Sequence, residues 1–227
     1  GVWAIAVNTL GVLYLLERGE SVTSAEDLRG RTSLASGKGA TPEIVLRHIL
    51  VQSGIDPDRD VDIQWKSEHA ECLAALLTTE GAVALLPQPF VTTARMKNPE
   101  VRVALDLNEL WEALPRDGGP TALITGAAVV RAEFAQAHPE AVDAFLEDYA
   151  RSVAWVNGNL PEAARRMEQY GIIGEEAAEL AIPDCHIVCI TGSEMREMLG
   201  AYLQVLYGQS PQSVGGALPG EEFYYVP

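Results

Sequence analysis

Leu34-Ala-Ser-Gly-Lys-Gly-Ala-Thr-Pro-Glu43 is the stretch around which the fold is organised. Residues 32–35 predict the end of a buried strand, and the small residues 36–40 predict a loop whose glycines tolerate positive φ. Thr41 is expected to cap a helix, and the Pro-Glu that follows suits its first turn. Because such a helix start offers unpaired N–H groups, the stretch suits either an anionic or polar ligand or an ordinary strand-to-helix turn.

Composition and charge exclude several classes of partner. A chain of 227 residues fits one large or two small domains, and 48% of its residues are hydrophobic, which is enough for a substantial core. The formal net charge of −16 argues against nucleic acid and anionic membrane surfaces as partners. No apolar run reaches about 18 residues, so no direct membrane insertion is expected. The loop matches neither a Walker A motif nor a G-x-G-x-x-G fingerprint, so nucleotide binding is not indicated.

The order of elements predicts an α/β architecture followed by a helical one. Apolar runs at 2–7 and 12–16 read as strands, and residues 24–105 alternate between helix and strand. That alternation favours a parallel sheet with helices on both faces and right-handed crossovers. After an extended segment at 121–130, the pattern is helical to residue 207. The tail at 213–225 is expected to be an extended strap with aromatic anchors.

The candidate ligand-binding residues follow from the strand ends. In open α/β sheets, ligands bind beyond the carboxyl ends of the strands. The residues selected in this way are Asn8, Thr9, Ser36, Gly37, Lys38, Gly39, Ala40, Thr41, Ser67, His69, Gln88, Pro89, Thr125 and Gly126. Three of them have an alternative: Gln88 could tie down a turn, His69 could be a surface cap, and Lys38 could simply be solvated. Trp65 and Phe90 could flank an aromatic ring.

The three cysteines do not form a disulfide framework. Cys185, His186 and Cys189 could in principle bind a metal, but the spacing lacks a second ligand pair nearby and the intervening Ile-Val indicates a buried segment. We therefore expect no metal site and no cofactor. The sequence also shows no nucleophile elbow, no Ser-His-Asp pattern and no paired carboxylates, so no catalytic residue is assigned.

Four stretches, taken in order and spacing, carry a family resemblance. They are Ala6-Val-Asn-Thr-Leu-Gly11; Asp27-Leu-Arg-Gly-Arg31 leading to Ser36-Gly-Lys-Gly-Ala-Thr41; Val83-Ala-Leu-Leu-Pro-Gln-Pro-Phe90; and Val130-Arg-Ala-Glu-Phe134 followed by His138-Pro-Glu-Ala141. With these stretches the chain resembles the solute-binding proteins of ATP-binding-cassette (ABC) importers, in the branch that includes nitrate, sulfonate, taurine and thiamine-pyrimidine-precursor binding proteins. The resemblance covers essentially the whole chain.

The resemblance implies a two-lobed, type II periplasmic-binding-protein fold. Residues 1–22 would be a crossing strand and hinge of the first lobe, 23–120 a complete second lobe with a parallel-type sheet, and 121–227 the mostly helical return into the first lobe with a C-terminal strap. The early βαβ units of the first lobe are absent from this sequence, and no signal peptide or lipoprotein signal is visible.

The resemblance also implies a function. It predicts an extracytoplasmic protein, periplasmic or lipoprotein-anchored, that binds a small polar or anionic solute between its lobes by hinge closure and delivers it to ABC permease subunits. Two alternatives remain open: a thiamine-pyrimidine-precursor synthase-like enzyme on the same fold, with His69 or His186 as working residue, and a ligand-sensing module.

An incomplete first lobe predicts self-association. The strand at 2–7 would have open edges, and the helices between 139 and 207 would expose apolar surface that soluble monomers rarely tolerate. We therefore expect this chain, expressed as such, to associate through that uncovered face of the first lobe.

Overall fold

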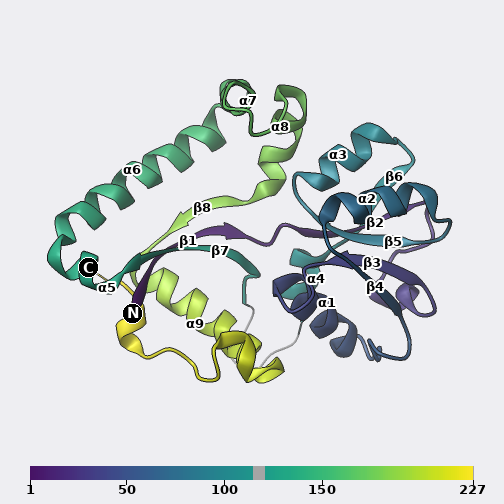
Figure 1. Ribbon diagram of the computed structural model, residues 1–227, viewed down its shortest axis with the longest axis horizontal. Helices are drawn as coiled ribbons and strands as arrows, with labels where there is room; N and C mark the ends of the chain where they lie inside the picture. Colours follow the sequence, from purple (N-terminus) through teal and green to yellow (C-terminus); the bar gives the residue numbers. More distant parts are fainter. Residues whose placement is uncertain (115–120, 227) are drawn as a thin grey trace. The chain divides into compact units, whose positions relative to one another are not determined.

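The computed structural model describes residues 1–114 and 121–226 and shows two compact units (Figure 1). Unit 1 comprises Gly1–Gly11 and Thr121–Pro227, and unit 2 comprises Val12–Pro120. The expected end of the second lobe at residue 120 falls in the segment 115–120, which lies outside the described residues. Residues 12–22 lie in unit 2 rather than with the first-lobe segment 1–22, because they contain a strand of the unit 2 sheet. Among the described residues, no helix combines the length and the apolar character that a membrane crossing requires.

Unit 2 is built on a five-stranded sheet with the strand order β4-β3-β5-β2-β6. Its strands are β2 (Leu13–Arg18), β3 (Thr32–Ser36), β4 (Asp62–Lys66), β5 (Val83–Pro87) and β6 (Val101–Asp106). β3 runs parallel to β4 and β5, whereas β2 runs antiparallel to β5 and β6. The predicted parallel-type sheet is thus corrected to a mixed sheet. No α-helix connects β2 to β3, only the 3₁₀-helix η1 (Ala25–Leu28), so the crossover rule that makes β3, β4 and β5 parallel does not apply to β2.

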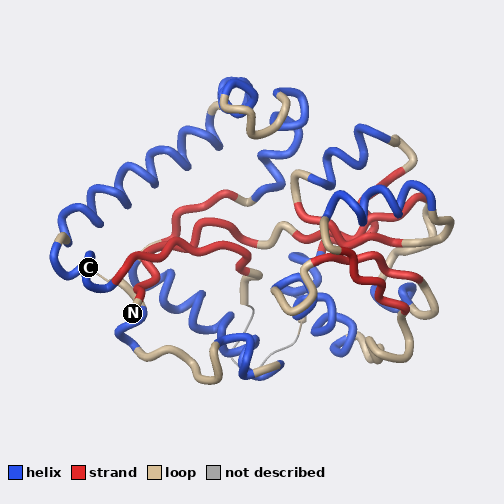
Figure 2. Tube along the Cα trace, in the orientation of Figure 1, coloured by secondary structure: helices blue, strands red, loops and turns tan. Residues whose placement is uncertain are grey.

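Helices cover both faces of this sheet, as the alternating pattern predicts (Figures 1 and 2). They are α1 (Thr41–Gln52), α2 (His69–Thr78), α3 (Phe90–Lys97) and α4 (Leu107–Ala113). α2 and α3 pack on one face, where Leu34, Leu76 and Leu86 are part of one buried cluster. α1 and α4 lie on the other face, where the fully buried Trp111 meets the ring of His48 with centroids 5.1 Å apart.

The sequence analysis missed α4. The start of α4 is nevertheless marked in the sequence by Asp106, a residue type that caps helices. Oδ1 of Asp106 accepts hydrogen bonds from the backbone N–H of Asn108 at 2.8 Å and of Glu109 at 3.4 Å. An Asp that ends a strand and caps the next helix in this way satisfies N–H groups that would otherwise lack a partner. The short length of α4, seven residues, gives too few turns for its apolar periodicity to be recognised.

Unit 1 contains a three-stranded antiparallel sheet with the order β7-β1-β8. Its strands are β1 (Val2–Leu10), β7 (Ile124–Arg131) and β8 (Ile187–Ile190). Its helices are α5 (Ala132–Ala137), α6 (Pro139–Gly158), α7 (Leu160–Gln169), α8 (Glu175–Ala181) and α9 (Gly192–Gln209), with the 3₁₀-helices η2 (Ile182–Cys185), η3 (Pro211–Val214) and η4 (Glu221–Phe223). These α-helices lie where the sequence pattern predicts them, whereas β8 was not predicted because four residues give too short a strand signal.

The C-terminal strap is anchored by Tyr225 on the first strand of the chain. The backbone N–H of Tyr225 donates to the carbonyl of Ala4 at 2.9 Å. Its ring stacks on Trp3 with centroids 6.0 Å apart, and its hydroxyl donates to Asp143 at 2.7 Å. These contacts agree with the expected aromatic anchoring. The tail is not extended throughout, however, because it contains η3 and η4.

An ion pair between the buried Glu17 and the partly exposed Arg102 joins β2 to β6 in unit 2. The Glu17 side chain is 3% exposed and pairs with Arg102, whose guanidinium also donates to the carbonyls of Gly19 and Val22. Burial alone would raise the pKa of Glu17, but hydrogen bonds from the Val22 N–H, from Ser21 and from Arg102 outweigh it and lower that pKa. The folded state therefore favours the charged carboxylate.

We expect Arg102→Met to lower the free energy of unfolding by about 3 kcal/mol at neutral pH, because it leaves a buried carboxylate without its cation. A carboxylate with a depressed pKa stabilises the fold above its unfolded pKa, and this contribution is lost as the pH falls through the folded pKa. The cost of the substitution, measured by urea denaturation, should thus shrink in acid. Arg59→Met, at a pair exposed on both sides, is the matched control and should change stability by less than about 0.5 kcal/mol. Equal effects at the two arginines would contradict this account.

Candidate functional site

The candidate site of unit 2 lies at the carboxyl ends of three parallel strands. β3 ends at Ser36, β4 at Lys66 and β5 at Pro87, and each is followed by a short loop and the first turn of α1, α2 or α3. Parallel strands end at the same edge of a sheet, so the N-termini of all three helices lie at this edge (Figure 1). The partial positive charge of each helix N-terminus favours a negative or polar group there. We call this edge, with residues 36–41, 66–69 and 87–90, the unit 2 edge.

The loop after β3 has the backbone conformation that its glycines predict. Gly37 and Gly39 have φ of +79° and +80°, and a Cβ on Gly37 would come within 3.0 Å of the Pro42 ring. The prediction that Thr41 caps α1 is wrong: Ala40 is the N-cap, and Thr41 is the first helical residue. The cap interaction comes instead from Glu43, whose carboxylate accepts from the Gly39 N–H at 2.7 Å. Lys38 is exposed at the tip of the loop.

His69 is held by contacts from two other elements and is not a surface cap. Its Nδ1 lies 2.6 Å from the hydroxyl oxygen of Ser36, and its ring packs against Phe90 with centroids 5.1 Å apart and planes inclined by 50°. Ser36 is only 2% exposed, so its hydroxyl serves this contact and does not face solvent. Burial lowers the pKa of His69, against the opposing effect of Glu68. Cys72, one turn along α2, is buried beside Ser36, and burial raises the pKa of its thiol.

Gln88 and Ser67 organise the turns that follow β5 and β4. Gln88 is 8% exposed, and its Oε1 accepts from the hydroxyl and the backbone N–H of Thr92 at 3.0 and 3.3 Å. The Gln88–Pro89 peptide bond is cis, and Pro89 is the N-cap of α3. Exposed Ser67 donates its backbone N–H to Glu71 at 3.0 Å. These contacts give Gln88 the turn-tying role that was considered as its alternative.

Asn8, Thr9, Thr125 and Gly126 come together in unit 1, on the neighbouring strands β1 and β7. The Thr125 hydroxyl donates to the Leu10 carbonyl at 2.5 Å, and the Thr9 hydroxyl donates to Oδ1 of Asn8 at 3.2 Å. Thr9 pairs with Gly126, where a Cβ would lie 2.3 Å from Oδ1 of Asn8 and 2.9 Å from Oγ1 of Thr9. A glycine is therefore required for the two polar side chains to stand over β7. The predicted residues thus form one cluster in each unit.

Sequence reasoning missed Cys72 and Thr92 as neighbours of the predicted site residues. Cys72 follows His69 by three residues and Thr92 follows Gln88 by four, so each lies on the same side of a turn or helix as its partner. Helical spacing from the candidates could have indicated both. The contact between Ser36 and His69 carries no such signal, because 33 residues separate the two.

The segment with Cys185, His186 and Cys189 has a structural role. His186 adopts a left-handed conformation with φ of 44°, and its Nδ1 contacts the carbonyl of Gly11. Burial raises the thiol pKa of both Cys185 and Cys189, which favours the neutral thiol over the thiolate that a metal requires. Across the described residues, no three His, Cys, Asp or Glu side chains are grouped so that they could bind a metal ion, and all three cysteines are free.

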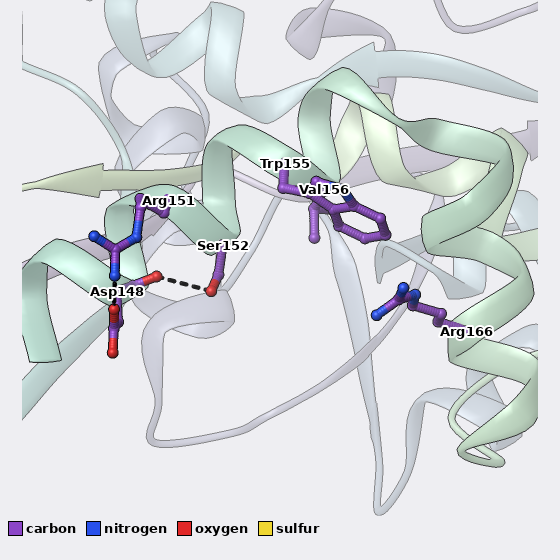
Figure 3. Close-up of a pocket in the computed structure, with 6 residues that line it drawn as sticks. All are labelled: Asp148, Arg151, Ser152, Trp155, Val156 and Arg166. Carbon is purple, nitrogen blue, oxygen red and sulfur yellow. Dashed lines mark hydrogen bonds and ion pairs between the residues drawn. The ribbon is translucent and has the colours of Figure 1, made fainter.

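An open groove of about 590 Å³ lies between α6 and α7 of unit 1 (Figure 3). It is lined by Asp148, Arg151, Ser152, Trp155, Val156 and Arg166. Its polar groups already have partners: Arg151 pairs with Asp148, Ser152 donates to the Asp148 carbonyl at 2.8 Å, and Arg166 lies over the Trp155 ring at 4.8 Å. The groove contains none of the predicted site residues, and we assign it no ligand.

Comparison with known proteins identifies the fold. The sequence model of the NMT1-like family matches residues 14–172. An ABC transporter structure from Parabacteroides distasonis has a TM-score of 0.74 at 22% identity, covering 100% of this chain and 74% of that one. The periplasmic aliphatic sulphonate binding protein SsuA from Escherichia coli has a TM-score of 0.75 at 15% identity, covering 100% and 70%. The desulfurization enzyme DSZB has a TM-score of 0.63 at 14% identity, covering 92% and 72%. No curated protein matches significantly. The fold is that of type II periplasmic binding proteins.

We expect Gly126→Ala to displace the Asn8 side chain and to cost about 1–2 kcal/mol of stability, because the new methyl group overlaps two side chains on β1. Thermal unfolding and the NMR signal of the Asn8 side-chain amide measure the two effects. Gly208→Ala is the control, since no atom lies within 4 Å of a Cβ there. Gly208 lies in α9, so alanine there should stabilise by about 0.5–1 kcal/mol. An unmoved Asn8 signal in Gly126→Ala would contradict the packing described above.

Proposed function

We propose, on the basis that this chain belongs to the NMT1-like family, that it is a solute-binding protein of an ABC importer. The observation that supports this best is the unit 2 edge, where the N-termini of α1, α2 and α3 meet the loop at 36–41. Such an edge binds a ligand through backbone N–H groups and helix dipoles. The fold shared with SsuA, a sulphonate-binding protein, adds support for the same class of function.

The proposed solute is a small polar or anionic molecule of the sulfonate type. An overall charge of −16 repels anions at long range, so an anion must be attracted by local groups. The helix N-termini, with Lys38 in the loop after β3 and Lys66 at the end of β4, supply that local positive potential. Phe90 beside His69 provides an apolar wall for the organic part of such a solute.

The proposed mechanism is hinge closure, in which the solute stabilises a closed arrangement through contacts with both lobes. Asn8, Thr9 and Gly126 are the groups that unit 1 would contribute. An importer subunit of this kind acts outside the cytoplasmic membrane, in the periplasm or as an anchored lipoprotein, and its proposed partners are ABC permease subunits. The periplasmic location of SsuA supports this proposal.

A thermal-shift screen of sulfonates, nitrate and pyrimidine compounds tests the function. A solute at 100 times its Kd should stabilise the protein by about 2.7 kcal/mol, which corresponds to a rise in Tm of about 5–10 °C. Lys38→Ala should weaken the binding of an anionic hit several-fold, whereas Lys97→Ala, at the opposite end of α3, should leave it unchanged.

The same screen distinguishes the proposed binding function from the alternative that this chain is an enzyme, as DSZB is on a similar fold. A bound solute should be recovered unchanged after incubation. Conversion of a solute, abolished by His69→Ala or His186→Ala, would overturn the proposal in favour of an enzyme. A screen without any stabilisation would count against solute binding itself.

We also propose that the 227-residue chain associates through unit 1. Apolar side chains are exposed in and between consecutive helices: Phe145 on α6, Tyr170 and Ile172 between α7 and α8, and Leu180 on α8, with exposed fractions of 48, 79, 70 and 57%. Burying such surface against a second copy removes it from water, and apolar surface of this kind is typical of protein interfaces.

We expect light scattering to show a mass that rises with concentration. The double substitution Ile172→Glu and Leu180→Glu should shift the protein toward the monomer, because charges cannot be buried there without partners. Val51→Glu, at a similarly exposed apolar position on α1 of unit 2, is the control and should leave the mass unchanged. A monomer at every concentration would contradict this proposal.

A further inference from the structure

His69 is a polar side chain of the unit 2 edge whose position is fixed by contacts with two other elements. It is the first residue of α2, so its ring lies at the positive end of that helix. Phe90, the first residue of α3, packs against the ring, and the Ser36 hydroxyl at the end of β3 contacts Nδ1. Three elements therefore determine where this imidazole lies, although it is partly exposed.

The contact with Ser36 engages Nδ1 and leaves Nε2 as the ring nitrogen available to a ligand. A serine hydroxyl has one hydrogen to donate, and in a neutral imidazole one nitrogen accepts while the other donates. When Ser36 donates to Nδ1, the hydrogen of the neutral ring is on Nε2. When the ring is protonated, Nδ1–H donates to the Ser36 oxygen, and Nε2–H remains a donor. With Ser36 as the donor to the neutral ring, His69 offers Nε2–H to a ligand in both charge states.

We propose that His69, with its tautomer set by Ser36, is the residue through which the unit 2 edge binds an anionic group, and that this binding is coupled to the uptake of a proton by the ring. The inference rests on the proposed solute-binding function and adds a preference for anions that strengthens in acid. Ser36 is a positioning residue here, because it is buried and acts through His69.

The charges around the ring are compatible with such coupling. Glu68, the N-cap of α2, favours the charged imidazole. Glu71 lies in the first turn of α2, and the buried thiol of Cys72 follows His69 by three residues. The end of β4 contributes Lys66, and the loop after β3 contributes Lys38. β3 and β5 contain no titratable residue, and α3 contains none before Arg95. In the free protein, burial keeps the pKa of His69 below its usual value of 6.5, so the ring is neutral near pH 7.

A bound anion reverses that balance, because it stabilises the imidazolium and leaves the neutral ring almost unaffected. By linkage, an anion that raises the pKa of His69 by one unit binds up to about tenfold more tightly below that pKa than above it. A neutral solute gains nothing from the proton, so its affinity should not vary with pH in this range. We therefore expect the affinity to change with pH for anionic solutes and not for neutral ones.

The first test is NMR of the free, full-length chain. The ¹⁵N shifts of His69 should report the Nε2–H tautomer in the neutral ring, and Ser36→Ala should mix the two tautomers. Excess inorganic sulfate should raise the titration midpoint of His69 and leave that of His138, an exposed histidine in unit 1, unchanged. A neutral Nδ1–H tautomer in the wild type, or a His69 midpoint that sulfate does not move, overturns the inference whether or not any solute is found.

The second test measures the affinity for ethanesulfonate at about pH 5.5 and pH 7.5, on either side of the usual histidine pKa. We expect the wild type to bind three- to tenfold more tightly at the lower pH. His69→Gln, which keeps a donor but cannot be charged, should lose that difference, and His138→Gln should keep it. Binding of equal strength at both pH values overturns the inference but leaves the proposed function intact. If ethanesulfonate fails to bind while sulfate moves the His69 midpoint as expected, the choice of solute is wrong and the inference stands.

Discussion

The parallel pairing of β3 with β4 and β5 is the constraint on which the rest of unit 2 depends. β3 pairs with β4 along residues 32–36 and with β5 at Ser33 and Leu34, so it is an interior strand. Its side chains Leu34 and Ala35 are buried on opposite faces. Parallel neighbours in a sheet require crossovers, and here these are α1, α2 and the segments around them. Because every crossover returns the chain to the same end of the sheet, the starts of α1, α2 and α3 are brought to one edge.

The polar groups of that edge are largely satisfied before any ligand arrives. The Glu43 carboxylate accepts from the loop N–H at Gly39, the Gln88 amide oxygen accepts from Thr92, and the Ser36 hydroxyl contacts His69. Such contacts stiffen the loops, which reduces the ordering that ligand binding would otherwise require. Because these groups already have partners, the residue best placed to bind a ligand is one that its neighbours hold in position and that keeps a free hydrogen-bond donor. We infer that this residue is His69 in unit 2.

Unit 1 is organised by a different constraint, because its central strand β1 is far in sequence from everything it pairs with. β1 pairs with β7 along nearly its whole length and with β8 near its end, both antiparallel. Gly126 allows β7 to approach where Asn8 and Thr9 stand, and Tyr225 closes the unit by bonding to Ala4. The helices α6 to α8 that follow β7 bury small residues such as Ala163, Ala164 and Ala178 against one another, while several of their large apolar side chains remain exposed.

The sequence alone determined the features that depend on local patterns. The 3.6-residue periodicity of α6 and α9 and the strand, loop and helix around Gly37 all arise from interactions within a few residues. Long-range contacts decided the rest. The antiparallel direction of β2 depends on the partners it finds in the sheet, and β8 and α4 are too short to show a period. The contact of Ser36 with His69 exists because two crossovers end at one edge, and no pattern within either segment encodes that meeting. The sequence could therefore identify the edge, but only the tertiary structure showed that Ser36 is buried there in contact with His69, because that contact depends on how the crossovers fold.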